Sequence, residues 1–426
     1  MDERNSVSRG YARYVLGMCF LLTALNVMDR QVLMVLVEPV KAEFGLSDSR
    51  MGFLTGTAFA LSHALAMIPV ARMADVGNRR NIIAAGLFIW SALTTLTGAA
   101  RNYAQLFLTR LGVGACETVG SGPAQSLLSD YFPPERRASA LSVHAAGGTF
   151  GAMAGFALGG LLAESVGWRW TFVYFGAPGI LLALLLWRTV KEPPRSTNSG
   201  EAGEEEIPGF RETLTFLGRL PAFRHVVLAA SLNSFVNWAM LSWAAAAMMR
   251  AHGLTTAEAG ARLAGSMTLS SAIGLIVAGF VADRLGRRDA RWYLWLPAGA
   301  SIGAIPFSIA FLLWPEPDVA FLLIIPGAFL NTMWVGTYNA VVQSLSRSRM
   351  RAMASAVHVL VSSALIGQGL GPLFVGVLSD ALEPSAGANS LRLALVVAVF
   401  GHLWGAVHSL LGARTLRADQ HTAQDG

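Results

Sequence analysis

Twelve windows of about 20 mostly apolar residues recur along the chain, and each is long enough to cross about 30 Å of hydrocarbon as a helix. They centre near residues 26, 62, 91, 116, 151, 178, 236, 270, 302, 330, 365 and 402. Only 14% of the 426 residues are charged, whereas soluble domains carry about 25%. We therefore predict an all-α membrane protein with twelve transmembrane helices.

One longer, polar segment interrupts the series of short turns between these windows. It divides the chain into an N-terminal six-helix bundle at residues 1–190, a cytoplasmic linker at 191–222 and a C-terminal six-helix bundle at 223–426. Apolar residues at helical spacing between 210 and 217 predict a helix on the membrane surface. A solvated loop is the alternative for this part.

The basic residues predict the orientation of the spans. With the N-terminus inside, 23 of the 32 Lys and Arg residues lie in cytoplasmic segments and seven lie on the opposite side. This positive-inside bias predicts a protein of the cell membrane with both termini on the cytoplasmic side. It also explains the net charge of +6 without nucleic-acid binding. Cys19 and Cys116 each lie inside an apolar run, which predicts neither a disulfide framework nor a metal site.

Two pairs of loop motifs reveal an internal repeat. ARMADVGNRR at 71–80 recurs as GFVADRLGRR at 279–288, with the aspartates 208 residues apart. Arg137 followed by ASALSVH recurs as Arg351 followed by AMASAVH, 214 residues apart. A duplication of half the chain is typical of transporters, whose substrate site lies between the repeats near the membrane midplane.

GFVADRLGRR matches the GxxxDRxGRR signature of the major facilitator superfamily, and the chain resembles this family over nearly its whole length. The DxxNRR form of the first copy is similar to spinster-like members. Further support for the resemblance comes from RLGVGACE at 110–117, DYFPPERR at 130–137, GWRWTF at 167–172 and EPPR at 192–195. The resemblance implies two pseudo-symmetric six-helix bundles that rock around a central cavity. It also implies secondary transport of lipid-like amphiphiles such as lysophospholipids or sphingoid compounds.

The repeated loops predict a cytoplasmic gate, in which Asp75 and Asp283 accept hydrogen bonds from a helix N-terminus. The gate residues are Asp75, Arg79, Arg80, Asp283, Arg284, Arg287 and Arg288. Anchoring of these arginines at anionic headgroups is the alternative. A row of glycines in the fifth helix predicts close helix packing; it comprises Gly147, Gly151, Gly155, Gly159 and Gly160.

Four charges lie inside predicted spans of the first half, where each costs at least about 2.5 to 3.5 kcal/mol. Asp29 and Arg30 share the first helix with Asn26, and Arg110 and Glu117 are two turns apart in the fourth. We expect Asp29, Arg30 and Glu117 to couple proton movement, because a carboxyl that exchanges arginine partners changes its proton occupancy. Arg110, Glu117 and Asn26 are predicted to bind substrate. A static buried ion-pair network is the alternative.

Amides and aromatics supply the polar character of the second half, whose helix cores contain no acidic residue. The predicted substrate contacts there are Asn233, Asn237, Asn331, Trp334 and Tyr338. Facing a charged first half, they favour a ligand with an ionic head and a large apolar part. Packing between helices is an equally good explanation of the aromatics.

Together these features predict a proton-coupled secondary transporter of a small amphiphilic substrate, acting as a monomer in the bilayer. We expect no enzyme activity, because the sequence shows no nucleophile combined with a general base. We also expect no cofactor and no metal, and we expect the proton gradient to be the energy source. No GxxxxGK[ST] motif supports ATP-driven pumping. A drug/proton antiporter, an organic-anion/proton symporter and a non-transporting receptor remain alternatives. Phe156 replaces the proline of the GPxxGG element of drug antiporters, which weighs against the first of these.

Overall fold

The computed structural model describes residues 8–193, 210–347 and 349–424. All regular elements in these ranges are helices, which confirms the predicted fold class. The chain forms two compact units, and each is described by itself. Unit 1 comprises Met1–Phe44, Leu61–Gly203 and Thr256–Ala261, and unit 2 comprises Gly45–Ala60, Glu204–Thr255 and Arg262–Gly426.

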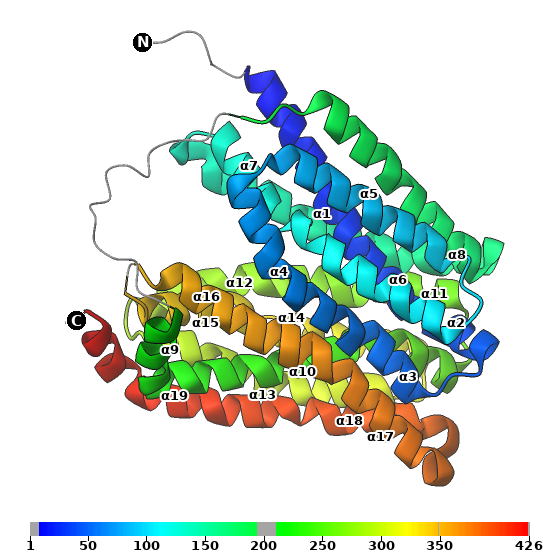
Figure 1. Cartoon of the computed structure of the whole chain (residues 1–426). Helices are drawn as coiled ribbons and strands as arrows, with labels where there is room; N and C mark the ends of the chain where they lie inside the picture. Colours follow the sequence, from blue (N-terminus) through cyan, green and yellow to red (C-terminus); the bar gives the residue numbers. More distant parts are fainter. Residues whose placement is uncertain (1–7, 194–209, 348, 425–426) are drawn as a thin grey trace. The chain divides into compact units, whose positions relative to one another are not determined.

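Unit 1 is built around α1 and α8 (Figure 1): the part of α8 before Gly167 packs along α1, and the part after it packs along α5. Its helices are α1 (Arg9–Val35), α2 (Val37–Phe44), α4 (Ala58–Val76, from Leu61 on), α5 (Arg79–Thr97), α6 (Tyr103–Cys116), a 3₁₀ turn (Glu117–Gly120), α7 (Gly122–Tyr131) and α8 (Pro134–Thr189).

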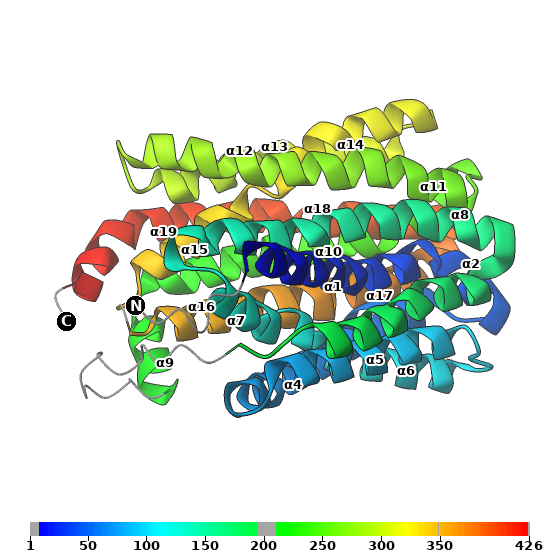
Figure 2. The same ribbon diagram turned by 90° about the horizontal axis from the view of Figure 1, so that it is seen from above.

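Unit 2 has α10 at its centre, in contact with α17, α18 and α19, while α12, α13 and α14 form a neighbouring layer (Figure 2). Its helices are α3 (Asp48–Gly52), a π-helical turn (Phe53–Thr57), α9 (Phe210–Arg219), α10 (Pro221–His252), the end of α11 (Thr256–Leu263, from Arg262 on), a second π turn (Ala264–Thr268), α12 (Leu269–Gly286), α13 (Trp292–Leu313), α14 (Pro317–Asn331), α15 (Trp334–Ser344), α16 (Arg351–Val359), a π segment (Leu360–Leu370), α17 (Gly371–Ala386), a 3₁₀ turn (Gly387–Asn389), α18 (Ser390–Val399) and α19 (Gly401–Gln424).

The helices account for the twelve predicted spans. Eight helical stretches are long and apolar enough to cross a membrane. The two longest each contain two spans, because Gly167 (φ +83°) interrupts α8 and Gly387 (φ +53°) separates α17 from α18. Positive φ is open to glycine at little cost, so both breaks occur where the sequence permits them. α5 and the α6–α7 pair supply the other two spans.

The unit boundaries differ from the predicted bundles at two short segments, where residues 45–60 join unit 2 and 256–261 join unit 1. Glycines allow both exchanges. A Cβ on Gly52 would lie 2.4 Å from the carbonyl oxygen of Pro372 in α17. A Cβ on Gly260 would lie 2.2 Å from the carbonyl oxygen of Phe156 in α8. Each segment is therefore held by direct contact between its own backbone and that of α17 or α8, which a small residue such as glycine permits.

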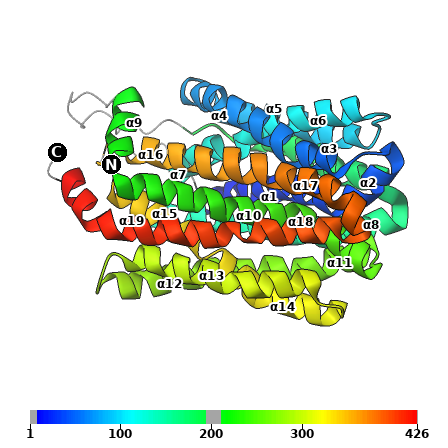
Figure 3. The same ribbon diagram turned by 90° about the horizontal axis from the view of Figure 1, so that it is seen from below.

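Polar residues fix the ends of several helices. Asn78 and Asn102 cap α5 and α6, accepting hydrogen bonds from the backbone N–H groups of Asn81 (2.9 Å) and Gln105 (3.0 Å). The linker segment predicted to be a surface helix contains α9, which crosses the beginnings of α10 and α16 (Figure 3). Residues 194–209 of that linker lie outside the described residues.

The GWRWTF motif ties three segments of unit 1 together just after Gly167. Trp168 Nε1 donates to Glu43 Oε2 (2.6 Å), and Arg169 Nε donates to Glu43 Oε1 (3.2 Å). Arg169 Nη1 also donates to the carbonyl oxygens of Gly98 (2.9 Å) and Ala100 (2.6 Å). The hydrogen bond from Arg169 holds the pKa of Glu43 below its usual value. The motif therefore fastens the turn inside α8 to the ends of α2 and α5.

The glycine row of α8 packs on α1, as the sequence predicts. A Cβ on Gly147 would lie 2.5 Å from the carbonyl oxygen of Phe20, and one on Gly151 would lie 2.1 Å from that of Ala24. Real Cβ atoms do not approach backbone that closely, so the row sets the distance between α1 and α8.

We predict that Gly151→Ala destabilises the protein by about 1 to 3 kcal/mol, because overpacking forces the α1 backbone to move. The measurement is the apparent Tm in detergent. Gly148→Ala is the matched control, since it lies in the same helix and its Cβ would meet only side-chain methyl groups, of Val27 at 3.4 Å and of Thr23 at 3.7 Å. Equal Tm values for the two variants would contradict this account of the packing.

Candidate functional site

A cluster of buried charges lies between α1 and the end of α6. Arg30 Nε donates to Glu117 Oε2 at 2.7 Å, and the Glu117 side chain is fully buried. Asn26 joins the same group, since its Nδ2 donates to the Glu117 carbonyl oxygen (3.1 Å) and its Oδ1 accepts from Arg30 Nη2 (3.1 Å). The structure thus brings together three of the residues that the sequence singled out, on the polar stripe of helix 1.

Asp29 takes a different partner from the neighbouring Arg30. Its Oδ2 accepts a hydrogen bond from Thr94 Oγ1 of α5 (3.0 Å), and the residue is only 1% exposed. Its Oδ1 has no hydrogen-bond partner among the described residues. Sequence analysis missed Thr94, although three threonines inside the apolar span of α5 are a signal that could have found it. The hydroxyl partly satisfies a carboxyl that has no arginine in direct contact.

Arg110 completes the cluster from α6. It is 3% exposed, and its charge attracts the carboxyls of both Glu117 and Asp29. The α-helix ends at Cys116, and Glu117 begins a 3₁₀ turn. The backbone N–H of Glu117 still bonds to the Val113 carbonyl oxygen of α6, so Glu117 lies at the C-terminal end of that helix, two turns after Arg110. The change of pitch directs the Glu117 backbone carbonyl to Asn26.

The four charged residues differ in their exposure to solvent. Asp29, Arg110 and Glu117 are at most 3% exposed, whereas the Arg30 side chain is 18% exposed. Arg30 is therefore the member that solutes reach first, and it is directly bonded to a carboxylate. An anionic group that competed for the Arg30 guanidinium would release Glu117. This is the exchange of partners that coupling of a proton to a solute requires.

The predicted contacts of the second half fall into two groups. Asn331 Nδ2 donates to Asn237 Oδ1 at 3.0 Å. Asn331 Oδ1 and Trp334 Nε1 have no hydrogen-bond partners within the described part of the chain. The sequence placed these residues on one helix, but α14 ends at Asn331 and α15 begins at Trp334. The two free polar atoms lie at this break, where a polar solute could bond to them.

Asn233 and Tyr338 have their polar atoms engaged inside unit 2. Asn233 Oδ1 accepts from Ser301 Oγ (2.7 Å) and lies 2.9 Å from His402 Nδ1. Tyr338, which is fully buried, bonds to Ser409 Oγ (3.1 Å). These bonds link α10, α13, α15 and α19. Substrate binding by Asn233 and Tyr338 stays a prediction, and in this structure both join helices.

Three motif fragments converge at the predicted gate of unit 1. Arg79 Nε donates to Glu192 Oε1 (2.7 Å), and its Nη1 donates to Asp130 Oδ2 (2.5 Å). The other Glu192 oxygen accepts from the Arg80 backbone N–H (2.8 Å), at the N-terminus of α5. The helix N-terminus expected to bind a loop aspartate is thus bound by Glu192, from the EPPR segment. An anion is favoured there by the helix dipole.

The loop aspartates themselves are exposed. Asp283 accepts a hydrogen bond from Tyr293 Oη (2.8 Å) rather than from a helix N-terminus. Arg284, Arg287 and Arg288 are exposed as well. Their role in a gate stays a prediction, as does that of Asp75.

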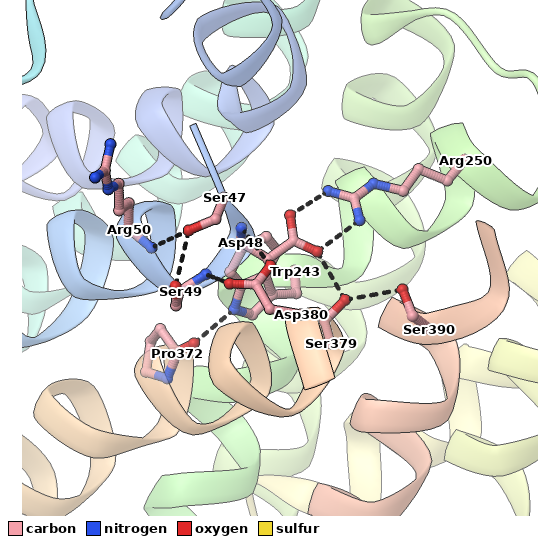
Figure 4. A network of polar contacts seen from close by, with 10 residues as sticks. All are labelled: Ser47, Asp48, Ser49, Arg50, Trp243, Arg250, Pro372, Ser379, Asp380 and Ser390. Carbon is pink, nitrogen blue, oxygen red and sulfur yellow. Dashed lines mark hydrogen bonds and ion pairs between the residues drawn. The ribbon is translucent and has the colours of Figure 1, made fainter. Parts of the chain in front are cut away.

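Sequence analysis missed a buried ion pair in unit 2, shown in Figure 4. Asp48, 2% exposed, accepts from Arg250 Nη1 (2.7 Å) and Nη2 (2.6 Å) and from Ser379 Oγ (2.7 Å). Asp380 of α17 accepts from the backbone N–H groups of Asp48 and Ser49, both at 2.9 Å. The start of α3 is thereby joined to the ends of α10 and α17. Arg250 is 202 residues from Asp48 along the chain, and no motif in the sequence connects the two positions.

No group of three or more metal-ligating side chains occurs among the residues that the structure describes. The histidines near the spans make interhelical contacts instead. His144 Nδ1 lies 3.0 Å from Thr23 Oγ1 and 3.1 Å from the Cys19 carbonyl oxygen. His63 Nδ1 lies 3.1 Å from the Gly114 carbonyl oxygen.

Comparison with known proteins adds a family match. Residues 19–372 match the model of the Major Facilitator Superfamily. An MFS-type efflux pump of Mycolicibacterium smegmatis is 31% identical over 98% of this chain and 96% of its own length. Human protein spinster homolog 1 is 24% identical, over all of this chain and 85% of its own. A probable L-galactonate transporter of Escherichia coli is also 24% identical, over 89% of this chain and 84% of its own.

A solved structure with the same fold is that of a bacterial homolog to the human lysosomal transporter spinster, in an inward-facing and unoccupied conformation. The two chains are 32% identical, with a TM-score of 0.88 over 97% of this chain and 99% of the other.

We predict that Arg250→Gln destabilises the protein by about 3 to 5 kcal/mol, because it leaves the buried Asp48 carboxylate without its counter-ion. The measurement is the apparent Tm in detergent at neutral pH. Arg262→Gln is the control, since Arg262 also pairs with an aspartate at 2.7 Å, but the Asp318 side chain is 83% exposed. Such exposed pairs contribute about 0 to 1 kcal/mol. Equal losses in the two variants would contradict a special role for the buried pair.

Proposed function

The chain belongs to the major facilitator superfamily of membrane transporters, and we propose that it moves a small, lipid-like amphiphile by proton-coupled alternating access. Members of this superfamily are transporters and not enzymes. The observation that carries the proposal is the Arg30–Glu117 pair at 2.7 Å, beside the Asp29 carboxyl, which forms no ion pair with any residue that the structure describes. The pair offers a site for an anion, and the second carboxyl offers a site for a proton.

In the proposed cycle Asp29 carries the coupled proton. Its carboxyl is bonded to a neutral hydroxyl of Thr94, so it can gain or lose a proton without breaking an ion pair. Protonation of Asp29 removes one negative charge from the field around Arg110 and Arg30, and both arginines then attract an added anion more strongly. Glu117 is the second proton site, and it is available once Arg30 turns to the substrate.

We infer the substrate class from the polar residues of each unit taken by itself. Arg30 and Arg110 in unit 1 supply positive charge for an acidic or zwitterionic head, with Asn26 as a polar contact. Asn237, Asn331 and Trp334 in unit 2 suit a larger body with few polar groups. The resemblance of the sequence motifs to spinster-like members implies a lysophospholipid or sphingoid compound as cargo.

Two other cargoes are favoured by specific relatives. The efflux pump at 31% identity favours a drug/proton antiporter. The galactonate transporter favours an organic-anion/proton symporter, and Arg30 with Arg110 would suit a carboxylate. Both alternatives would use the same four charged residues for proton coupling. The cargo and the proton coupling are therefore tested in separate experiments.

The proposal includes a position in the cell membrane as a monomer, with both termini in the cytoplasm. Opposite gates would then lie at the two ends of the spans. The cytoplasmic gate is formed by the two repeated loops with Asp75, Arg79, Arg80 and their counterparts around Asp283. The Asp48–Arg250 pair lies near the other end of α10 and holds segment 45–60 within unit 2.

We predict that Asp29→Asn abolishes acceleration of uptake by a pH gradient, while gradient-free exchange keeps at least about a third of its wild-type rate. The amide has nearly the same shape and still accepts from Thr94, but it cannot carry the proton. The measurement is substrate flux in proteoliposomes with and without an inward proton gradient. Glu135→Gln is the matched control, because Glu135 is exposed at the start of α8. Unchanged gradient dependence in Asp29→Asn would remove Asp29 from the mechanism.

The cargo is tested by flux of three radiolabelled probes, namely a lysophospholipid, galactonate and the lipophilic cation ethidium. We expect gradient-dependent flux of the lysophospholipid and a loss of at least about tenfold in Arg30→Gln, since each charge-assisted bond contributes about 1.5 to 3 kcal/mol. Gradient-dependent flux of ethidium alone would favour the antiporter. Absence of flux for all three would favour a receptor.

A further inference from the structure

Each unit has a basic hollow away from the buried charge cluster. The hollow of unit 2 has a volume of about 650 Å³ and that of unit 1 about 330 Å³. Sites for small molecules typically measure about 300 to 1,000 Å³, so each can hold a polar group of moderate size. Neither takes part in the transport cycle proposed above.

The hollow of unit 2 lies between α9 and the segment that precedes α16. Its basic residues are Arg211, Arg219 and Arg347. The Arg347 guanidinium lies 4.5 Å from the centre of the Phe216 ring, and its Nε has no hydrogen-bond partner in the described ranges. α9 is held in place by the buried Thr213 and Leu217, and its basic residues stay on the exposed side.

The hollow of unit 1 lies between the start of α1 and the end of α7. Its basic residues are Arg9, Arg13 and Arg136, and all three are exposed. Tyr131 and Phe132 form its apolar wall. Tyr131 is fixed by its hydroxyl, which donates to the Lys191 carbonyl oxygen. Both hollows therefore combine three guanidinium groups with an aromatic wall.

The two hollows occupy corresponding places in the repeat. The 214-residue spacing between Arg137 and Arg351 places Arg136 opposite Met350, and both residues line their hollows. The first long helix of each half begins beside its hollow, at Arg9 for α1 and just after Arg219 for α10. The individual arginines do not align, since position 133 is proline where Arg347 stands in the second half. The two halves thus share the combination of three arginines with an aromatic wall, but the arginines occupy different positions of the repeat.

None of the six arginines forms an ion pair with an acidic side chain among the described residues. Glu212 lines the larger hollow as a single acidic residue. Each hollow thus has an excess of positive charge at the end of a membrane span. Basic groups near a membrane surface attract anionic lipids by about 1 kcal/mol each.

We propose that each hollow binds the phosphate headgroup of an anionic phospholipid, as a resident lipid that is not the transported substrate. The arginines would donate to the phosphate oxygens, and the aromatic wall would contact the glycerol and the first methylenes of the chains. Arginine suits this role because its planar donors match phosphate geometry. The proposal is independent of the transported substrate and of which side of the membrane the hollows face.

The test is native mass spectrometry of the full chain in detergent, titrated with phosphatidylglycerol or phosphatidylcholine. We expect two phosphatidylglycerol molecules to bind the wild type more tightly than any phosphatidylcholine. Arg211→Gln/Arg219→Gln/Arg347→Gln should lose one of them, with an affinity loss of about 100-fold. Arg9→Gln/Arg13→Gln/Arg136→Gln should lose the other.

The matched control is Arg188→Gln/Arg224→Gln/Arg414→Gln, which removes three exposed arginines outside both hollows. It should keep both lipids, and a circular dichroism melt confirms that every variant is folded. Equal binding of the two lipids, or equal losses in the control, would overturn the proposal. Soluble glycerol phosphate is a further arm. Binding of glycerol phosphate at the lipid's affinity would overturn the lipid in favour of a free phosphate ligand.

Discussion

Charge buried among apolar helices must be neutralised, and unit 1 does this with four residues from two segments. Asp29 and Glu117 offset Arg30 and Arg110, so the formal charge of the cluster is zero. Each of them alone would cost at least about 2.5 to 3.5 kcal/mol in the middle of a span. The positions of α1 and α6 are consequently tied to each other, and α5 is tied to both through Thr94.

The packing around this cluster depends on glycine. α8 approaches α1 so closely at Gly147 and Gly151 that a methyl group would meet backbone oxygens. α1 is therefore held by α8 on one side and can present its polar stripe on another. The backbone of α1 can therefore keep Asp29 and Arg30 close to Glu117 while individual side chains exchange partners. Rigid packing and exchangeable bonds lie on different faces of one helix.

Most of the fold could be predicted from the sequence, because long apolar windows and the repeated loops are local patterns. The glycine row could be predicted for the same reason. The individual bonds could not. Nothing local distinguishes Thr94 from the other threonines of α5, and nothing local tells which of Arg30 and Arg110 bonds directly to Glu117. Asp48, Arg250 and Asp380 lie far apart in the sequence, so their association required the folded chain.

The bonds between Asp380 and the backbone at Asp48 and Ser49 also bear on how the chain is made. They join residues separated by 332 and 331 positions. At about 5 to 20 residues per second, the ribosome adds Asp380 roughly 17 to 66 seconds after Asp48. Through that interval the first turn of α3 lacks its carboxylate acceptor, and for the first 202 of these positions the Asp48 side chain also lacks Arg250. The polar contacts that hold the start of the second span in unit 2 can therefore be completed only after most of the chain has been made.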